Sequence, residues 1–154
     1  MTTPDQRLEA LGIVLPTPAR PVANYVGYNI SGNLVFTSGQ LPFHEGTLTQ
    51  TGLLGDAVSK EEGKAAARQS AINVLAQLKD ACGGDLSRVR RVIKLGGFIA
   101  CAPHFTEHPV VMNGASDLMV DVFGEIGRHA RTTVGVPSLP LNASVEVEGI
   151  FEIA

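Results

Sequence analysis

The sequence predicts an α+β fold in which two helices pack on one face of a mixed β-sheet. Two segments carry apolar residues at helical spacing, and several shorter segments favour strands. The predicted order is strand, strand, helix, strand, helix, strand, strand. Because two helices on one side cover only one sheet face, the other face must meet water or another subunit.

The chain of 154 residues suits a single domain, which we expect to span residues 1–154. Hydrophobic residues make up 44% and charged residues 18%, as is usual for a globular protein. The proline-rich stretch 16–21 separates the predicted main body from an N-terminal segment with one short helix within residues 5–12. We therefore treat residues 1–22 as an N-terminal arm.

Two short strands are predicted to follow this arm, over residues 25–30 and 34–38. The Ser-Gly-Asn sequence at 31–33 between them is typical of a hairpin turn. The next stretch, residues 44–56, is rich in Gly and Thr and predicts a loop.

The first helix of the main body has the strongest local signals. Ser59 and Glu62 form a capping-box pattern, since each side chain can satisfy an amide of the first turn. Gly83 and Gly84 provide the stop. The predicted stripe, with Arg68 as a break, consists of Ala65, Arg68, Ile72, Leu75, Leu78 and Cys82.

A long strand is predicted over residues 89–100 and a second helix over residues 113–126, closed by Gly127. The positions of the strand expected to face the core are Ile93, Leu95, Gly97, Ile99 and Cys101. The helix residues expected to be buried are Leu118, Met119, Val122, Phe123 and Ile126.

The chain is predicted to end in a hairpin, with arms at residues 132–136 and 143–153. Alternation puts Glu146, Glu148 and Glu152 on the face of the last arm opposite its apolar residues. A simple antiparallel register would bring Arg131 near Glu146 or Glu148. This group could form a polar pocket, or an ordinary cross-strand salt bridge on a wet surface.

Three segments of the sequence belong together: Asn24-Tyr-Val-Gly-Tyr28, Phe36-Thr-Ser-Gly-Gln-Leu-Pro42, and Arg131-Thr-Thr-Val-Gly-Val-Pro-Ser-Leu-Pro140 followed by Val145-Glu-Val-Glu148. They resemble the Rid (reactive intermediate deaminase) or YjgF family, also labelled endoribonuclease L-PSP-like. The resemblance covers most of the chain from about Ala23 onward. It implies a chorismate-mutase-like fold and a homotrimer with clefts between subunits.

The resemblance also implies an activity, the hydrolysis of small 2-imino or enamine acids to 2-keto acids and ammonia. Arg131 would hold the substrate carboxylate, while Glu146 and the backbone near Thr133 would position a water. Further cleft positions implied by the resemblance are Tyr25, Ser38, Gly39 and Asn113. An imine is already electrophilic, so neither a metal nor another cofactor is expected.

The sequence also departs from the family pattern. The chain is longer than a typical member, with its arm and an extended segment over residues 103–112. Thr133 stands where many members have a cysteine, and Ser116 where an aromatic residue often follows the family asparagine. These changes suit a different or bulkier ligand, or a site without turnover.

Other motifs favour ordinary structural roles. The H-x-x-E-H spacing at 104–108 resembles a zinc-protease motif, but Pro103 and Pro109 bracket it and favour a loop. Cys82 and Cys101 are expected in the core. His129 precedes Arg131 by two residues, and either borders the cleft or lies in a solvated turn.

The remaining observations limit the partners. A net charge of -3 gives no general attraction to nucleic acid, which leaves an endoribonuclease or translation inhibitor as the least supported alternative. No apolar run is long enough to cross a membrane, and the polar N-terminus resembles no signal peptide, so we expect a cytoplasmic protein. The second alternative is a trimer that binds a small carboxylate without turning it over.

Overall fold

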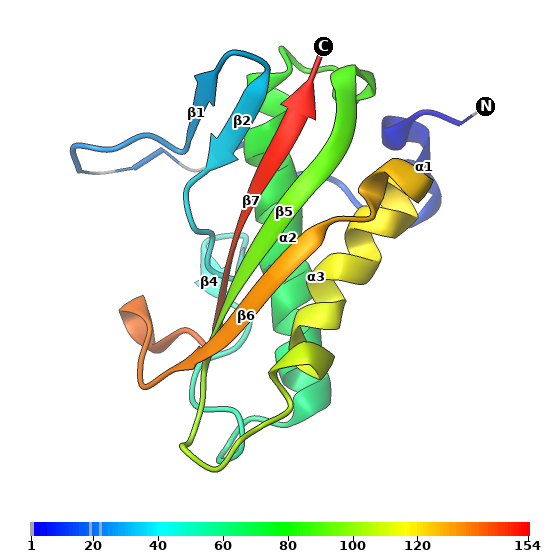
Figure 1. The fold of residues 1–154 in the computed structure, drawn as a ribbon. Helices are drawn as coiled ribbons and strands as arrows, with labels where there is room; N and C mark the ends of the chain where they lie inside the picture. The colour runs from blue at the N-terminus through cyan, green and yellow to red at the C-terminus, as the bar shows by residue number, and fades with distance from the viewer. Residues whose placement is uncertain (1, 19, 22) are drawn as a thin grey trace.

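The computed structural model describes residues 2–18, 20–21 and 23–154 (Figure 1). Its centre is a five-stranded sheet in the order β1-β2-β7-β5-β6. These strands are β1 (Tyr28–Ser31), β2 (Leu34–Thr37), β5 (Val89–Ala100), β6 (Ala130–Val136) and β7 (Val145–Ile153). The α+β fold predicted from the sequence is confirmed.

Three α-helices and a small ribbon complete the part of the chain that the structure describes. The helices are α1 (Pro4–Ala10), α2 (Lys60–Ala81) and α3 (His108–Phe123); in Figure 1, α2 lies behind the sheet and α3 stands to the right of β6. The predicted loop after β2 contains a two-stranded ribbon, β3 (Phe43–His44) and β4 (Thr47–Leu48). Short 3-10 turns are η1 (Leu86–Arg88), η2 (Gly124–Gly127) and η3 (Pro140–Asn142).

The predicted C-terminal hairpin is wrong, because β5 lies between β6 and β7. β6 pairs with β5 in parallel, whereas β7 pairs with β5 and β2 in antiparallel fashion. Parallel neighbours need a crossover connection, and α3 provides it across one face of the sheet. The chain after β6 then passes to the far side of β5, which leaves β6 as an edge strand.

The core lies between the sheet and the two long helices. The capping box of α2 is present, since the Ser59 hydroxyl accepts from the Glu62 amide and the Glu62 carboxylate accepts from the Ser59 amide. The predicted stripe of α2 is correct at Leu75, Leu78 and Cys82, which are buried. It is wrong at Ala65, which is exposed, because this helix packs on α3 as well as on the sheet.

The second helix differs from its predicted bounds at both ends. It begins at His108 rather than residue 113, because Pro109 occupies the first turn, where its missing amide has no helical partner. It ends at Phe123, and Gly124 with a φ of 67° takes the terminal position. Ile126 therefore falls in η2 and is exposed rather than buried.

The alternation predicted for β5 holds at Leu95, Gly97 and Ile99 but is wrong at Ile93. Register shifts against β7 occur between Val89 and Arg91 and between Val92 and Lys94. Such an irregularity shifts which residues face the core. Val92 is buried there, whereas Ile93 is only partly buried.

The face of the sheet opposite α2 and α3 carries carboxylates and apolar side chains together. On β7, Glu146, Glu148 and Glu152 lie on this face, while Val145, Val147 and Phe151 are buried on the other, as predicted. Four apolar residues share the open face. Phe36 pairs with Ile150, and Phe98 lies between Val134 and Glu146 on the neighbouring strands. We call this surface the open sheet face.

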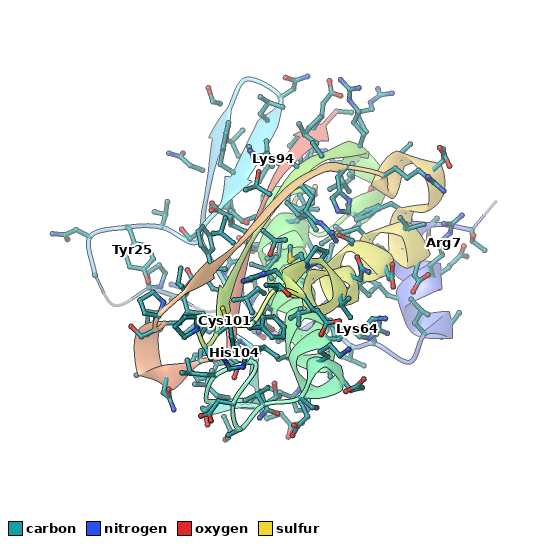
Figure 2. All side chains as sticks on the ribbon, turned by 60° about the horizontal axis from the view of Figure 1, so that its bottom comes forward. Arg7, Tyr25, Lys64, Lys94, Cys101 and His104 are labelled. Carbon is teal, nitrogen blue, oxygen red and sulfur yellow. The ribbon has the colours of Figure 1, made fainter. Side chains whose placement is uncertain are left out.

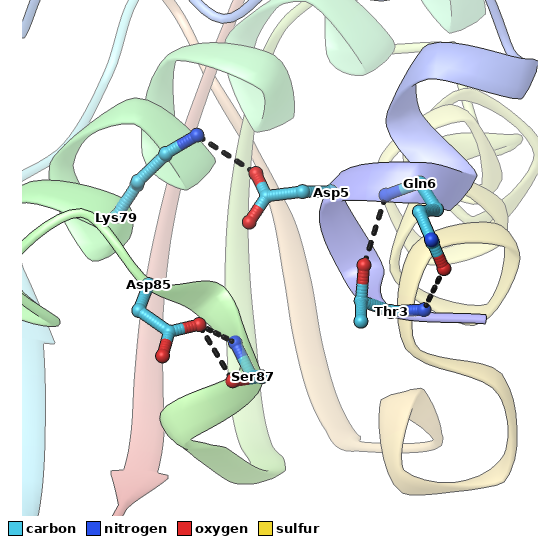
Figure 3. Close-up of polar contacts among 6 residues, drawn as sticks. All are labelled: Thr3, Asp5, Gln6, Lys79, Asp85 and Ser87. Carbon is cyan, nitrogen blue, oxygen red and sulfur yellow. Dashed lines mark hydrogen bonds and ion pairs between the residues drawn. The ribbon is translucent and has the colours of Figure 1, made fainter. Parts of the chain in front are cut away.

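The N-terminal arm packs against α2 and α3 through its helix α1. The Thr3 hydroxyl accepts from the Gln6 amide, and the Gln6 side chain accepts from the Thr3 amide (Figure 3). The Asp5 carboxylate lies 2.7 Å from Nζ of Lys79 near the end of α2, and Leu8 is buried.

Candidate functional site

Arg131 is held at the edge of the sheet on the side of α3. Its Nη1 donates to Oδ1 of Asn113 at 2.8 Å and to Oγ of Ser116 at 3.2 Å. Both partners come from α3, one helical turn apart, so their side chains lie on the same helix face. The parallel pairing of β6 with β5 brings Arg131 to this face, level with Leu95.

These two hydrogen bonds engage only Nη1 of the Arg131 guanidinium and leave Nε and Nη2 available for a ligand. Nη1 carries two hydrogens, and its two bonds account for both. Nε and Nη2 have no hydrogen-bond or ion-pair partner among the described residues. Since these two nitrogens form one edge of the planar fork, they match the two oxygens of a carboxylate.

A cavity of about 610 Å³ opens beside this arginine. Its lining comes from α3, the segment between η2 and β6, and the start of β6, and consists of Ser116, Asp117, Val120, Asp121, Arg128, His129 and Arg131. His129 is half-buried, with Nδ1 2.6 Å from the Gly127 carbonyl oxygen and Nε2 2.9 Å from the Ser116 hydroxyl oxygen. Burial, and to a lesser degree the charge of Arg131, lower the pKa of His129 against the opposing bond to Gly127.

Thr133 lies two residues further along β6 and so points to the same side as Arg131. Its hydroxyl oxygen is buried and has no hydrogen-bond partner among the described residues. It lies over Gly97, where an added Cβ would come within 3.1 Å of it and would collide with the Met112 sulfur. A buried hydroxyl without a partner has an unmet hydrogen-bonding capacity.

Glu146 occupies the open sheet face, paired with Phe98 of β5. Its carboxylate packs against Gly39, where any Cβ would collide with Oε1. Burial, and then the charge of Glu148, raise the pKa of Glu146. The carboxylate forms no hydrogen bond or ion pair with the described residues.

Ser38 ties the loop before β1 to this region. Its amide donates to the Gly27 carbonyl at 2.8 Å, and its hydroxyl donates to the Val26 carbonyl at 2.5 Å. Tyr25 lies on that loop and is 59% exposed, so its ring is available to a ligand or a partner (Figure 2). The loop that carries Tyr25 is thus tied to Ser38, and the next residue, Gly39, packs against Glu146.

The predicted proximity of Arg131 to Glu146 or Glu148 is wrong within one chain. Arg131 points toward α3, whereas Glu146 lies on the opposite face of the sheet, two strands away. The chain therefore carries two half-sites. One is formed by Arg131, Asn113, Ser116, His129 and Thr133, and the other by Glu146, Gly39, Ser38 and Tyr25.

Sequence reasoning left His129 undecided and assigned no role to Ser116. The structure places both in contact, next to Arg131. The only signal in the sequence was the serine at a position where the resembled family often has an aromatic residue.

The two histidines of the H-x-x-E-H segment do not act together. His104 lies in the loop, whereas His108 begins α3, and its Nε2 lies 3.4 Å from the Cys101 sulfur. Burial raises the pKa of the Cys101 thiol, which favours its neutral form. Over residues 2–18, 20–21 and 23–154, no group of three or more His, Cys, Asp or Glu side chains is arranged to hold a metal ion. The same ranges contain no helix with the length and apolar character needed to span a membrane.

The fold and these half-sites define a small α+β protein. It holds an anchored arginine, Arg131, at one sheet edge and a half-buried carboxylate, Glu146, on the open sheet face. Over residues 5–153 the sequence matches the family described as "YjgF/chorismate mutase-like, putative endoribonuclease". The chain belongs to this YjgF/chorismate mutase-like family, which confirms the resemblance found in the sequence.

Individual relatives extend over nearly the whole chain. Protein TCP17 of Trypanosoma cruzi is 50% identical over 147 residues, covering 95% of this chain and 91% of that protein. The crystal structure of Atu1372 from Agrobacterium tumefaciens, a protein of unknown function, is 52% identical with a TM-score of 0.93, covering 98% of this chain and 92% of its own. A 2-iminobutanoate/2-iminopropanoate deaminase of Dermatophagoides farinae is 31% identical over 141 residues, covering 92% of this chain and 94% of that protein.

Proposed function

We propose that the protein is a hydrolytic deaminase of small 2-imino acids, which releases the 2-keto acid and ammonia. The observation that carries this proposal is the anchored Arg131, whose Nε and Nη2 edge has no partner among the described residues. A bidentate bond to a carboxylate would fix the C=N carbon of the substrate. The similarity to a 2-iminobutanoate/2-iminopropanoate deaminase supports the choice of substrate class.

Glu146 is the group that we assign to proton transfer. Water adds to the imine carbon as the Glu146 carboxylate takes one of its protons and passes it to the nitrogen. Glu146 then takes the remaining hydroxyl proton of the carbinolamine and delivers it to the nitrogen as the C–N bond breaks, which leaves the 2-keto acid and ammonia. A carboxyl group with a raised pKa is better matched to this exchange near neutral pH than an ordinary one. Tyr25, Ser38 and Gly39 would line the same side of the cleft.

The two half-sites have to come from neighbouring subunits for this chemistry. Arg131 and Glu146 face opposite sides of the sheet in one chain. We propose that a homotrimer places the β6 edge of one subunit on the open sheet face of the next. Exposed apolar side chains on that face, Phe36 and Val134 among them, favour burial by a partner.

The test is an imine-hydrolysis assay with semicarbazide trapping, in which an amino-acid oxidase generates the substrates. Arg131→Ala should lower kcat/KM by about tenfold to a hundredfold, because it removes two charge-assisted hydrogen bonds. Glu146→Gln should lower kcat. Arg90→Ala, at an exposed arginine at the start of β5, is the matched control and should hydrolyse at the wild-type rate.

A second candidate is a trimer that binds a small carboxylate without turnover. It is favoured by the fact that carboxylate binding needs only the Arg131 half-site, which one chain completes. An inert wild-type protein that still binds 2-oxobutanoate in an Arg131-dependent way would overturn the deaminase and support this alternative.

A further inference from the structure

Ser116 and His129 form a hydrogen-bonded chain that ends on Arg131. The Gly127 carbonyl oxygen can only accept, so the His129 Nδ1 that lies 2.6 Å from it must carry a hydrogen. In the neutral ring, Nε2 is then an acceptor. The hydrogen bond to Gly127 thereby fixes the tautomer of His129.

This tautomer sets the direction of the Ser116 hydroxyl. Nε2 of His129 lies 2.9 Å from Oγ of Ser116 and can only accept, so the hydroxyl donates to it. The lone pairs of Oγ are left to accept from Nη1 of Arg131 at 3.2 Å. Together with Asn113 at 2.8 Å, this oxygen occupies both hydrogens of Nη1 and opposes rotation of the guanidinium plane.

We propose that Ser116 and His129 are positioning residues, which orient the Arg131 guanidinium so that its Nε and Nη2 edge meets the substrate carboxylate. The inference rests on the proposed role of Arg131 as carboxylate anchor. It adds that an aromatic residue at position 116 could not supply this contact, so Ser116 and His129 distinguish this site from those with an aromatic residue there.

The same geometry gives carboxylate binding a dependence on pH. The charged groups that line the cavity with His129 are Arg128 and Arg131 beside it, and Asp117 and Asp121 on α3. The lowered pKa of His129 keeps the ring neutral at neutral pH. A carboxylate bound at Arg131 adds a negative charge nearby and favours the protonated ring. By linkage, affinity for the carboxylate should then rise as pH falls through the pKa of His129 in the complex.

The experiment measures the Kd of 2-oxobutanoate by calorimetry between pH 7.5 and 5.5, on protein confirmed as folded by circular dichroism. Ser116→Ala should weaken binding about threefold to tenfold, the effect of one lost hydrogen bond, and Ser116→Thr should restore most of it. His129→Asn can keep the bond to Gly127 but not reach Ser116, and should weaken binding as Ser116→Ala does. His129→Gln should give a Kd that no longer changes with pH.

His44→Gln serves as the control, because His44 is exposed on the β3–β4 ribbon, where its side chain lies 3.8 Å from the Glu45 carboxylate. It should keep both the affinity and the pH dependence of the wild type. The inference is overturned if Ser116→Ala and His129→Asn bind as the wild type does, or if His129→Gln keeps the wild-type pH dependence. The deaminase proposal fails separately, when the wild type binds 2-oxobutanoate but does not hydrolyse imines; absence of binding by the wild type overturns both.

Discussion

At the scale of single residues, Glu146 is perturbed by two influences that act in the same direction. Burial makes its charged form less favourable, and the negative charge of Glu148 on the same face adds to this effect. Glu148→Gln removes the second influence and should lower the pKa of Glu146. We therefore expect the acidic limb of the kcat/KM profile for imine hydrolysis to move to lower pH in this variant.

Glu152→Gln is the matched control for that shift, since Glu152 lies on the same strand face but does not contribute to the raised pKa of Glu146. Its profile should overlay that of the wild type. An acidic limb that stays in place in Glu148→Gln would show that Glu146 is not the base.

The same raised pKa predicts an effect of Glu146 on stability. The unfolded chain ionises at a lower pH than the folded one, so the group destabilises the fold as pH rises through the folded-state pKa. Glu146→Gln should consequently raise Tm near pH 7, and the gain should disappear under acidic conditions where both states are protonated. Thermal melts at several pH values measure this. An equal Tm difference at every pH would contradict it.

The sequence motif around Arg131 pointed to a carboxylate anchor, but it could not identify what holds the guanidinium. Asn113 and Ser116 lie more than a dozen residues earlier, and they reach Arg131 only because α3 crosses on its side of the sheet. Contacts of this kind depend on the topology, which local patterns do not encode.

At the scale of elements, the packing of α2 on α3 depends on Gly114. A Cβ at this position would collide with the backbone carbonyl oxygen of Lys64, so the two helices could not approach as closely. Helix propensity alone predicts that Gly114→Ala stabilises by about 1 kcal/mol. We expect the opposite, a loss of roughly 1–3 kcal/mol or more, because the obstacle is backbone.

Gly63→Ala is the matched comparison on α2. There the added Cβ would meet the ends of the Leu54 and Val111 side chains rather than backbone, and side chains adjust more easily than backbone. Its free energy of unfolding, measured in urea, should fall less than that of Gly114→Ala. A stabilised Gly114→Ala variant would contradict this account of the helix contact.

Elements defined by local chemistry were predicted better than those defined by pairing. The start of α2 followed from Ser59 and Glu62, whose contacts are three residues apart. The C-terminal hairpin was predicted from adjacency in sequence and is wrong, because β5 pairs with both β6 and β7. Pro109 was interpreted as a boundary of a loop, although the first turn of a helix accommodates proline equally well.

At the scale of the whole molecule, the proposed assembly depends on the open sheet face. Phe36 on this face is 40% exposed in the single chain. Phe36→Asp should give a folded monomer without imine hydrolysis, because a charge would be buried at the subunit contact. Light scattering after size-exclusion chromatography measures the mass.

Val14→Asp is the control for assembly, because Val14 is exposed on the N-terminal arm beside α2, away from both the open sheet face and the β6 edge. It should keep the oligomeric state of the wild type. A wild-type protein that is monomeric at micromolar concentration would contradict the assembly itself.

In the proposed assembly Arg131 of one subunit and Glu146 of its neighbour complete one site, and mixing two impaired variants tests this most directly. Arg131→Ala and Glu146→Gln are each expected to keep at most about a tenth of the wild-type rate alone. After subunits are exchanged by unfolding and refolding an equal mixture, about a quarter of the interfaces should combine an intact Arg131 with an intact Glu146. We expect imine hydrolysis to return to roughly that fraction of the wild-type rate. A mixture that exchanges subunits, as shown by mass spectrometry, yet hydrolyses imines no faster than the separate variants would contradict the shared site.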